Sequence, residues 1–211
     1  MPYEFSAEGR RRLEEVRAFM DDHIYPNEEE YATEREEVGA HGYPPIMDKL
    51  KAAARERGLW NLFLPHLAPD SPGTKLSNLD YSPISEQLGK VGFASEALNC
   101  AAPDTGNMEI LNLYGSETVK RDWLSPLLEG EIRSAFAMTE PAVASSDATN
   151  IELRIERDGD DYVLNGRKWW IRPGPSRACA IRKPCPSSLI RFEAGTRASS
   201  NSTSAWPSWS M

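Results

Sequence analysis

The sequence predicts an α+β protein in which an all-helical region of five or six helices precedes the first strands of an antiparallel sheet and a disordered tail. Up to about residue 130, apolar residues recur every three or four positions, as on the buried face of a helix. From Ile132 the period shortens to two, which is typical of strands with one solvent-facing side. After Ile171 the composition changes abruptly to Arg, Ser and Pro, which favours disorder.

Composition and charge exclude several classes of protein. The 211 residues are 40% hydrophobic and 27% charged, as in ordinary globular proteins. A net charge of −8 argues against nucleic-acid binding. No apolar run approaches the roughly 18 residues of a membrane helix, and the acidic N-terminus resembles neither a signal nor a transit peptide. The three cysteines and three histidines lack metal-ligand spacing, so no metal site is expected.

The first helix is predicted to begin near Ala7, because Ser6 is a favourable N-cap residue. Pro26 should interrupt this helix, and residues 27–37 should continue as a polar, exposed helix. The apolar stripe of the first helix comprises Leu13, Val16, Met20 and Ile24.

The third helix should start after Pro45, which suits a first helical turn, and should end at Gly58 in the left-handed conformation. Residues 79–88 are predicted to be helical with Pro83 in the first turn, and residues 93–100 to form a short helix.

Residues 101–107 are predicted to be a loop between helices. Further helices should start at Met108 and at Ser116, and Gly130 should end the second of them.

The predicted sheet follows. Ile151, Leu153 and Ile155 alternate with charged residues, and residues 158–161 form a turn into a return strand at 162–164. Asn165-Gly166 is typical of a type I′ hairpin turn, which would lead into a last strand over 168–171.

Residues 136–147 combine a strand-like start with a turn. Ser134 to Met138 is predicted to be a strand, and Pro141 then leads into small and hydroxylated residues. Such a backbone can approach a flat or phosphorylated ligand closely and offer it N–H groups and hydroxyls. The alternative is a strand that ends in an ordinary Pro/Ser turn.

Several segments, taken together and in order, resemble acyl-CoA dehydrogenases, and the Met-Thr-Glu-Pro and Ala-Ser-Ser-Asp motifs are closest to the large-dehydrogenase subgroup. The resemblance runs from about residue 3 to residue 171. It implies that residues 1–131 are the family's N-terminal helical domain, that 132–171 begin its antiparallel, β-barrel-like middle domain, and that 172–211 are an unrelated tail. The segments that carry the resemblance are Leu59 to Pro65, Ala102 to Glu109, Tyr114 to Gly130, Ala135 to Pro141 and Asn165 to Ile171.

The resemblance implies an FAD-dependent oxidoreductase that introduces an α,β double bond into a fatty acyl-CoA during fatty acid β-oxidation. In this family a carboxylate base removes the α proton, and the β hydrogen leaves as a hydride to FAD. The partners implied are the acyl-CoA substrate, electron-transfer flavoprotein or a similar acceptor, and further copies of the chain in a homo-oligomer. Neither a nucleic acid nor a membrane span is expected.

The resemblance also assigns flavin contacts. Main-chain groups near Met138 and the Thr139 hydroxyl would bond the pyrimidine edge, where charge accumulates on reduction. Ser146 would also touch the substrate. Trp170 would pack against the isoalloxazine ring. The alternative is that Trp169 and Trp170 form a pair in the core of the hairpin. The full set of cofactor-binding residues implied is Phe136, Ala137, Met138, Thr139, Ser145, Ser146, Trp170 and Ile171.

Two departures from the family limit this expectation. Where the family has a Thr or Ser after the position of Ile171, this sequence has Arg172, which Pro173 restrains to extended geometry. The family's remaining β-domain and its C-terminal helical bundle, which carries the catalytic base, have no counterpart in the sequence. We therefore assign no catalytic residue, and we expect a C-terminally truncated chain that is inactive alone.

Two alternatives stay open. The tail at 172–211 is either a coding sequence read out of frame or a genuine disordered segment. The chain is either an acyl-CoA dehydrogenase, with a related flavin oxidase as the variant within that class, or a non-catalytic fragment that acts as an assembly or binding module. The lack of a targeting peptide predicts a cytoplasmic location, with mitochondria and peroxisomes left open.

Overall fold

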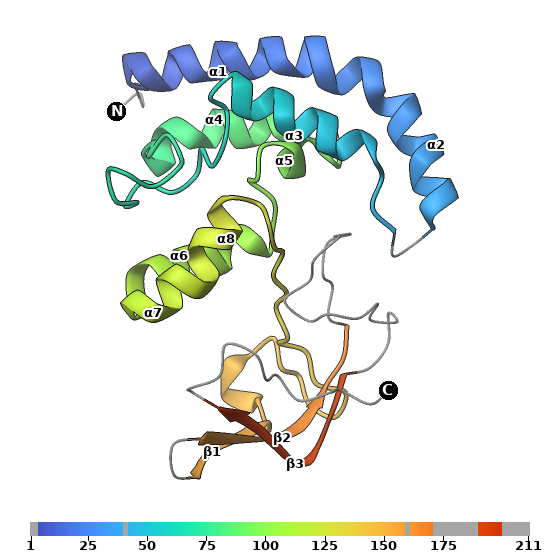
Figure 1. Cartoon of the computed structure of the whole chain (residues 1–211), viewed down its shortest axis with the longest axis vertical. Coiled ribbons are helices and arrows are strands. Elements are labelled where there is room, and N and C mark those ends of the chain that lie inside the picture. Colours follow the sequence, from blue (N-terminus) through green and yellow to red (C-terminus); the bar gives the residue numbers. More distant parts are fainter. Residues whose placement is uncertain (1–3, 40–41, 159–160, 171–189, 200–211) are drawn as a thin grey trace. The chain divides into compact units, whose positions relative to one another are not determined.

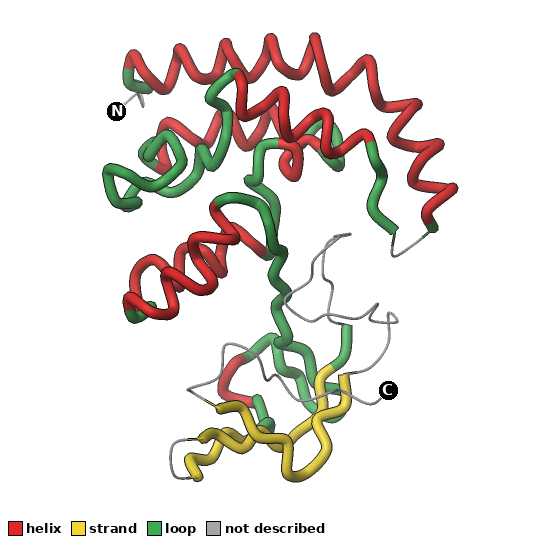
Figure 2. The backbone as a smooth tube through the Cα atoms, viewed as in Figure 1, coloured by secondary structure: helices red, strands yellow, loops and turns green. Residues whose placement is uncertain are grey.

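The computed structural model describes residues 4–39, 42–158, 161–170 and 190–199. The chain divides into a helical unit that ends at Ser134 and a β unit that begins at Ala135. Within the described residues, every α-helix lies in the first unit and every strand in the second (Figures 1 and 2). The predicted α+β class is therefore confirmed.

The N-terminal helical run begins where the sequence predicts. Helix α1 spans Ala7–Phe19, and the Ser6 hydroxyl accepts the Gly9 N–H at 2.9 Å. The run continues through a π-helical turn at Met20–Ile24 and a 3-10 turn at Tyr25–Asn27 into α2, Glu28–Val38. Pro26, which has no N–H to donate, lies at this irregularity.

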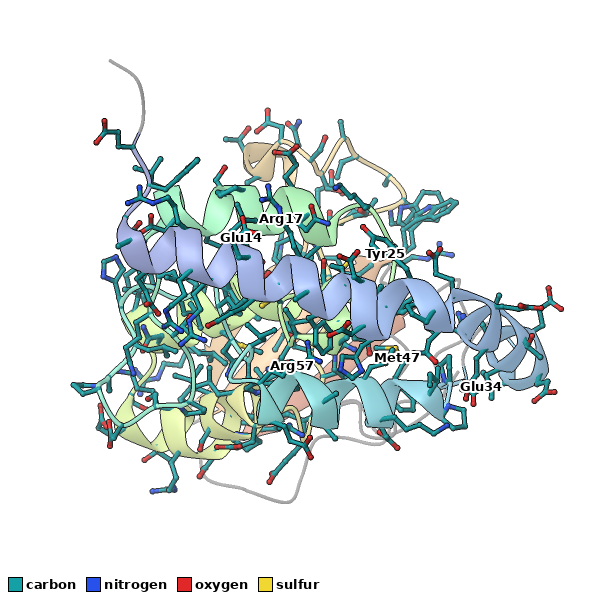
Figure 3. The ribbon with its side chains drawn as sticks, turned by 90° about the horizontal axis from the view of Figure 1, so that it is seen from above. Glu14, Arg17, Tyr25, Glu34, Met47 and Arg57 are labelled. Atoms are coloured by element: carbon teal, nitrogen blue, oxygen red, sulfur yellow. The ribbon has the colours of Figure 1, made fainter. Side chains whose placement is uncertain are left out.

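Helix α3 spans Ile46–Glu56 and ends as predicted, because Gly58 takes a left-handed φ of 66°. Its buried Met47 lies between α3 and the N-terminal helical run (Figure 3). By contrast, Glu14 and Arg17 form an exposed ion pair of 2.6 Å on α1, which Figure 3 also labels.

Helix α4 spans Asn78–Leu88, and α5 is a short helix at Ala94–Ala97. Pro83 lies inside α4, so its placement in the first turn is wrong. The helix nevertheless continues through Pro83 to Leu88, and its N-terminus is capped by Ser77, whose hydroxyl accepts the Asp80 N–H at 3.1 Å.

Helix α6 spans Asp104–Tyr114, so the predicted loop at 101–107 is wrong in its second half. Asp104 fixes the first turn, because its carboxylate accepts the Ser134 N–H at 2.7 Å and also bonds the Arg133 guanidinium. A charge-paired carboxylate in a first helical turn also suits the helix dipole.

The last helical run begins at the N-cap Ser116, as predicted. It comprises α7 at Glu117–Val119, a π-helical turn at Lys120–Leu124, and α8 at Ser125–Leu128. Gly130, with a φ of 69°, follows the run, again as predicted.

Two apolar clusters stabilise the helical unit. The larger one joins α1, α3, α4 and α5, and includes Val16, Phe19, Leu50, Ile84, Leu88 and Leu98. The smaller one lies among α6, α8 and the segment after α3, and includes Leu64, Leu67, Met108, Leu124, Leu127 and Leu128. Figure 1 shows the corresponding two groups of helices.

Two buried asparagines link these clusters. Asn61 and Asn99 both have a positive φ, of 53° and 54°, which asparagine tolerates better than most residues. The Asn99 side-chain amide donates to Asn61 Oδ1 at 2.7 Å, and the Asn61 amide donates to the Leu128 carbonyl at 2.8 Å. The Trp60 indole N–H donates to the same carbonyl at 2.7 Å, so α8 is fixed to the helical layer by polar bonds as well as by packing.

The β unit contains a three-stranded antiparallel sheet in the order β1-β2-β3. The strands are β1 at Arg154–Asp158, β2 at Asp161–Lys168 and β3 at Ile190–Ser199. Asp158 pairs with Asp161 across the predicted turn, so this hairpin is confirmed.

Four expectations for the strands are wrong. Lys168 ends β2, and Trp169 and Trp170 lie outside any strand, so the predicted last strand over 168–171 does not form in the described residues. Ser134 to Met138 lies outside the sheet. Residues 151–153 precede β1, because the main-chain N–H groups of Glu152 and Leu153 bond the Glu140 carboxylate. Asn165-Gly166 lies inside β2, at a register irregularity. Glycine is needed there for a close approach, since a Cβ atom on Gly166 would lie 2.8 Å from Leu153 Cα.

Within the tail that we predicted to be disordered, residues 190–199 form β3, which pairs with β2. The open edge of β2 supplies unpaired N–H and C=O groups, and an adjacent strand satisfies them. Ile171 and the rest of the predicted tail lie outside the described residues.

Candidate functional site

A buried ion pair organises the segment that we predict to contact a flavin. Lys168 Nζ, at the end of β2, lies 2.8 Å from Glu140 Oε1, and the two side chains are only 6% and 5% exposed. Lys168 Nζ also donates to the Met138 carbonyl at 2.8 Å. The ion pair therefore holds the 136–147 segment against the end of β2.

The Glu140 carboxylate also bonds the chain that leads into β1. It accepts the main-chain N–H groups of Glu152 at 2.8 Å and Leu153 at 3.0 Å. A buried carboxylate with a lysine and two amide donors has its hydrogen-bonding capacity satisfied. Glu140 thus connects three pieces of chain that are distant in sequence.

The electrostatics of Glu140 suit a structural anion. The hydrogen bond from the Lys168 ammonium lowers the pKa of Glu140, and the two main-chain donors lower this pKa further, against the opposing effect of burial. The carboxylate is therefore ionised at neutral pH and fully engaged.

Met138 and Thr139 present an asymmetric set of polar groups. Their carbonyls are both occupied, by Lys168 Nζ and by the Trp169 N–H at 3.0 Å. Their own N–H groups and the Thr139 hydroxyl make no hydrogen bond to any residue that the structure describes. A ligand that approaches these two residues meets free donors, which fits the acceptor-rich pyrimidine edge of a flavin.

The two predicted serines have different environments. Ser145 is buried, and its hydroxyl accepts the Glu140 N–H at 2.7 Å. It stabilises the turn, so its side chain is already engaged within the protein. Ser146 is exposed and so remains accessible to a ligand.

The apolar candidates are open to solvent. Phe136 is 56% exposed and Trp170 is 73% exposed, and Ala137 is exposed as well. Trp170 has a φ of 54°, which is uncommon for a bulky residue and is found preferentially at functional sites. Trp169 contacts it edge-on, with ring centroids 5.9 Å apart, so the two indoles form a pair, with Trp170 outward.

Sequence reasoning missed Glu140 and Lys168 as organisers of the site. The available signal was their sequence position, since each charged residue directly adjoins a predicted flavin-contacting segment. Their pairing could not be read from sequence, because 28 positions of chain, including a hairpin, separate them. Ile171, the last predicted contact, lies outside the described residues.

Other site types find no support in the described part of the chain. No group of three or more His, Cys, Asp or Glu residues there is arranged to hold a metal ion. None of its helices has the length and apolarity needed to cross a membrane.

The chain thus combines an all-helical unit with an antiparallel β unit, and the segment before the sheet offers free donors beside exposed aromatic rings. Models for the acyl-CoA dehydrogenase N-terminal domain and middle domain match residues 6–131 and 135–181. The chain belongs to the acyl-CoA dehydrogenase family. The second match runs beyond Ile171, where we had placed the end of the resemblance.

Individual relatives agree with this assignment. The chain is 50% identical over 183 residues to acyl-CoA dehydrogenase family member 11 of Gallus gallus, a match that covers 83% of this chain and 22% of that protein. It is 54% identical over 166 residues to the probable acyl-CoA dehydrogenase FadE2 of Mycobacterium tuberculosis, covering 77% of this chain and 39% of that protein. The chain thus spans well under half the length of these curated relatives.

Solved structures show the same relationship. A putative acyl-CoA dehydrogenase from Mycobacterium abscessus superposes with a TM-score of 0.73 at 48% identity, covering 80% of this chain and 43% of that one. A glutaryl-CoA dehydrogenase from Mycobacterium smegmatis in complex with FADH2 superposes with a TM-score of 0.58 at 26% identity, covering 79% and 39%.

Proposed function

We propose that the β unit supplies one wall of an FAD site. The observation that carries the proposal is the pair of occupied carbonyls and free donors at Met138 and Thr139, flanked by the exposed rings of Phe136 and Trp170. Donors suit the flavin's polar edge, and exposed aromatic rings suit its flat face. The FADH2-bound relative supports the choice of cofactor.

The reaction proposed for a protein that contains this chain is the α,β-dehydrogenation of a fatty acyl-CoA, as in fatty acid β-oxidation. FAD supplies the hydride acceptor when it is bound. Ser146, exposed beside the same segment, is proposed to contact the acyl-CoA. Electron-transfer flavoprotein as acceptor, a homo-oligomeric state and a cytoplasmic location are parts of the same proposal.

The test is a titration of the isotope-labelled chain with FAD, followed by NMR shifts of individual amide groups. We expect weak, saturable binding that moves the Met138 and Thr139 amides, because only one wall of a site is proposed here. Thr139→Val should weaken binding, since it removes the free hydroxyl while keeping the side-chain shape. Thr33→Val, on exposed α2, is the control and should leave binding unchanged.

Three results would decide against parts of this proposal. No shift at Met138 and Thr139 with millimolar FAD would reject the flavin site. FAD that stays bound to the chain in a 1:1 ratio through gel filtration would contradict the proposal that the chain supplies only one wall of the site. Dye-coupled turnover of an acyl-CoA by the chain alone would show that it contains a base, which we do not assign.

A second candidate function is that of an assembly module. Helix α6 carries an exposed apolar stripe of Ile110, Leu113 and Tyr114, at the i, i+3 and i+4 spacing of a helix contact surface. If this function is the correct one, Leu113→Glu should abolish self-association in sedimentation without affecting the FAD titration. The two candidates are thus separable in one preparation.

A further inference from the structure

The Glu140–Lys168 pair lies beside the free donors of Met138 and Thr139, and the inference drawn from it rests on the proposed function. Lys168 Nζ occupies the Met138 carbonyl at 2.8 Å while it pairs with Glu140 at the same distance. The next residue along β2, Trp169, occupies the Thr139 carbonyl. One short stretch of chain thus engages both neighbouring acceptors.

We propose that Lys168 and Glu140 are positioning residues for the flavin. They keep the carbonyls of Met138 and Thr139 hydrogen-bonded within the protein, so that these two residues face the flavin only as hydrogen-bond donors. A carbonyl freed of its lysine would present negative partial charge to an acceptor edge. Reduction increases the electron density at that edge. The freed carbonyl would therefore repel reduced flavin more strongly than oxidised flavin and would weaken its binding more. The pair therefore favours binding of the reduced form.

The pair as a whole is neutral, which separates this role from a simple effect of charge. Glu140 orients Lys168, because it holds the ammonium from one side while the Met138 carbonyl accepts from the other. Loss of either residue should free the carbonyl. Lys168→Met and Glu140→Gln change the local charge in opposite directions, so an effect of charge alone would have opposite signs in the two variants.

The experiment measures the affinities of the labelled full chain for oxidised FAD and for dithionite-reduced FAD under anaerobic conditions. In both variants we expect the preference for reduced FAD to fall about tenfold, the effect of one charge-assisted hydrogen bond. For a two-electron couple this corresponds to a bound-flavin potential about 30 mV lower. The double variant Glu140→Gln/Lys168→Met buries no charge, and it should show the same loss if a single variant fails to fold.

Arg133→Met is the matched control, because Arg133 is an equally buried member of an ion pair in the helical unit. It should lower stability and leave the ratio of the two affinities unchanged. Opposite shifts in the two single variants, or equal weakening of both flavin forms, would overturn the positioning role while the flavin site stands. Failure of the unsubstituted chain to bind either form would overturn the proposed function and this inference together.

Discussion

Arg133 Nη1 lies 2.5 Å from Glu96 Oε1 in the interior of the helical unit. The same guanidinium donates through Nε to Asp104, and Lys51 Nζ lies 3.2 Å from the same Glu96 oxygen. Two cations and two carboxylates therefore share one largely buried cluster. It joins α3, α5 and α6 to the chain segment that ends the helical unit.

Arg133→Met should lower the free energy of unfolding of the helical unit by about 3–5 kcal/mol. The substitution keeps much of the side-chain bulk but leaves Glu96 and Asp104 with less compensating charge in a buried place. Urea unfolding followed by circular dichroism measures the effect. Arg17→Met, which breaks the exposed Glu14 pair, should cost at most about 0.5 kcal/mol. Equal losses in both variants would contradict the importance of burial.

Asp80 should make stability depend on pH. The Ser6 main-chain N–H lowers the pKa of this carboxyl group, and the hydroxyls of Ser6 and Ser77 lower it further. A lowered folded-state pKa gives stabilisation that is present above the unfolded value of about 3.9 and is lost as pH falls through the folded value. Asp80→Asn should therefore destabilise the protein most at pH 5–7, and the difference in unfolding free energy should shrink below about pH 3.9. A pH-independent difference would exclude ionisation as the cause.

Gly130→Ala should destabilise the helical unit by about 1–3 kcal/mol. A Cβ atom there would lie 2.8 Å from Trp60 Cζ2, and the φ of 69° is unfavourable for alanine. Gly106→Ala, inside α6 with open space around the added Cβ, should instead stabilise the protein by about 0.5–1 kcal/mol. Thermal unfolding of the two variants measures both, and a loss of stability in both would contradict the account.

Gly166→Ala should loosen the β unit selectively. The added Cβ would meet Leu153 Cα at 2.8 Å, and backbone cannot yield as a flexible side chain does. We expect faster hydrogen exchange at the Leu153 amide, which bonds Glu140, with unchanged protection in α1 and α3. Unchanged exchange at Leu153 would show that the strands accommodate the methyl group.

Local signals predicted the helical unit well where a residue acts through its own backbone. Ser6, Gly58, Ser116 and Gly130 begin or end helices as expected, because caps and left-handed glycines depend on few neighbours. Asp104 shows where such local signals fail. Its helix starts earlier than the pattern indicated, since its carboxylate is fixed by Arg133, far along the chain.

The β unit was harder to predict for the same reason. Asn165-Gly166 has the composition of a tight turn, yet packing against Leu153 gives the glycine a different role inside β2. The candidate flavin contacts came from resemblance to a family, and they remain predictions. Their support by Glu140 and Lys168 depends on long-range pairing, which no local pattern specifies.

The Trp60 indole N–H, which donates to the Leu128 carbonyl, is a natural spectroscopic probe of the contact between α8 and the helical layer. Indole N–H protons resonate apart from the amide envelope, so one peak reports whether α8 remains attached to the helical layer. Since the guanidinium of Arg55 also lies 3.9 Å above the Trp60 ring, detachment would alter the emission of this tryptophan as well. Detachment of α8 can thus be followed separately from unfolding of the rest of the helical unit.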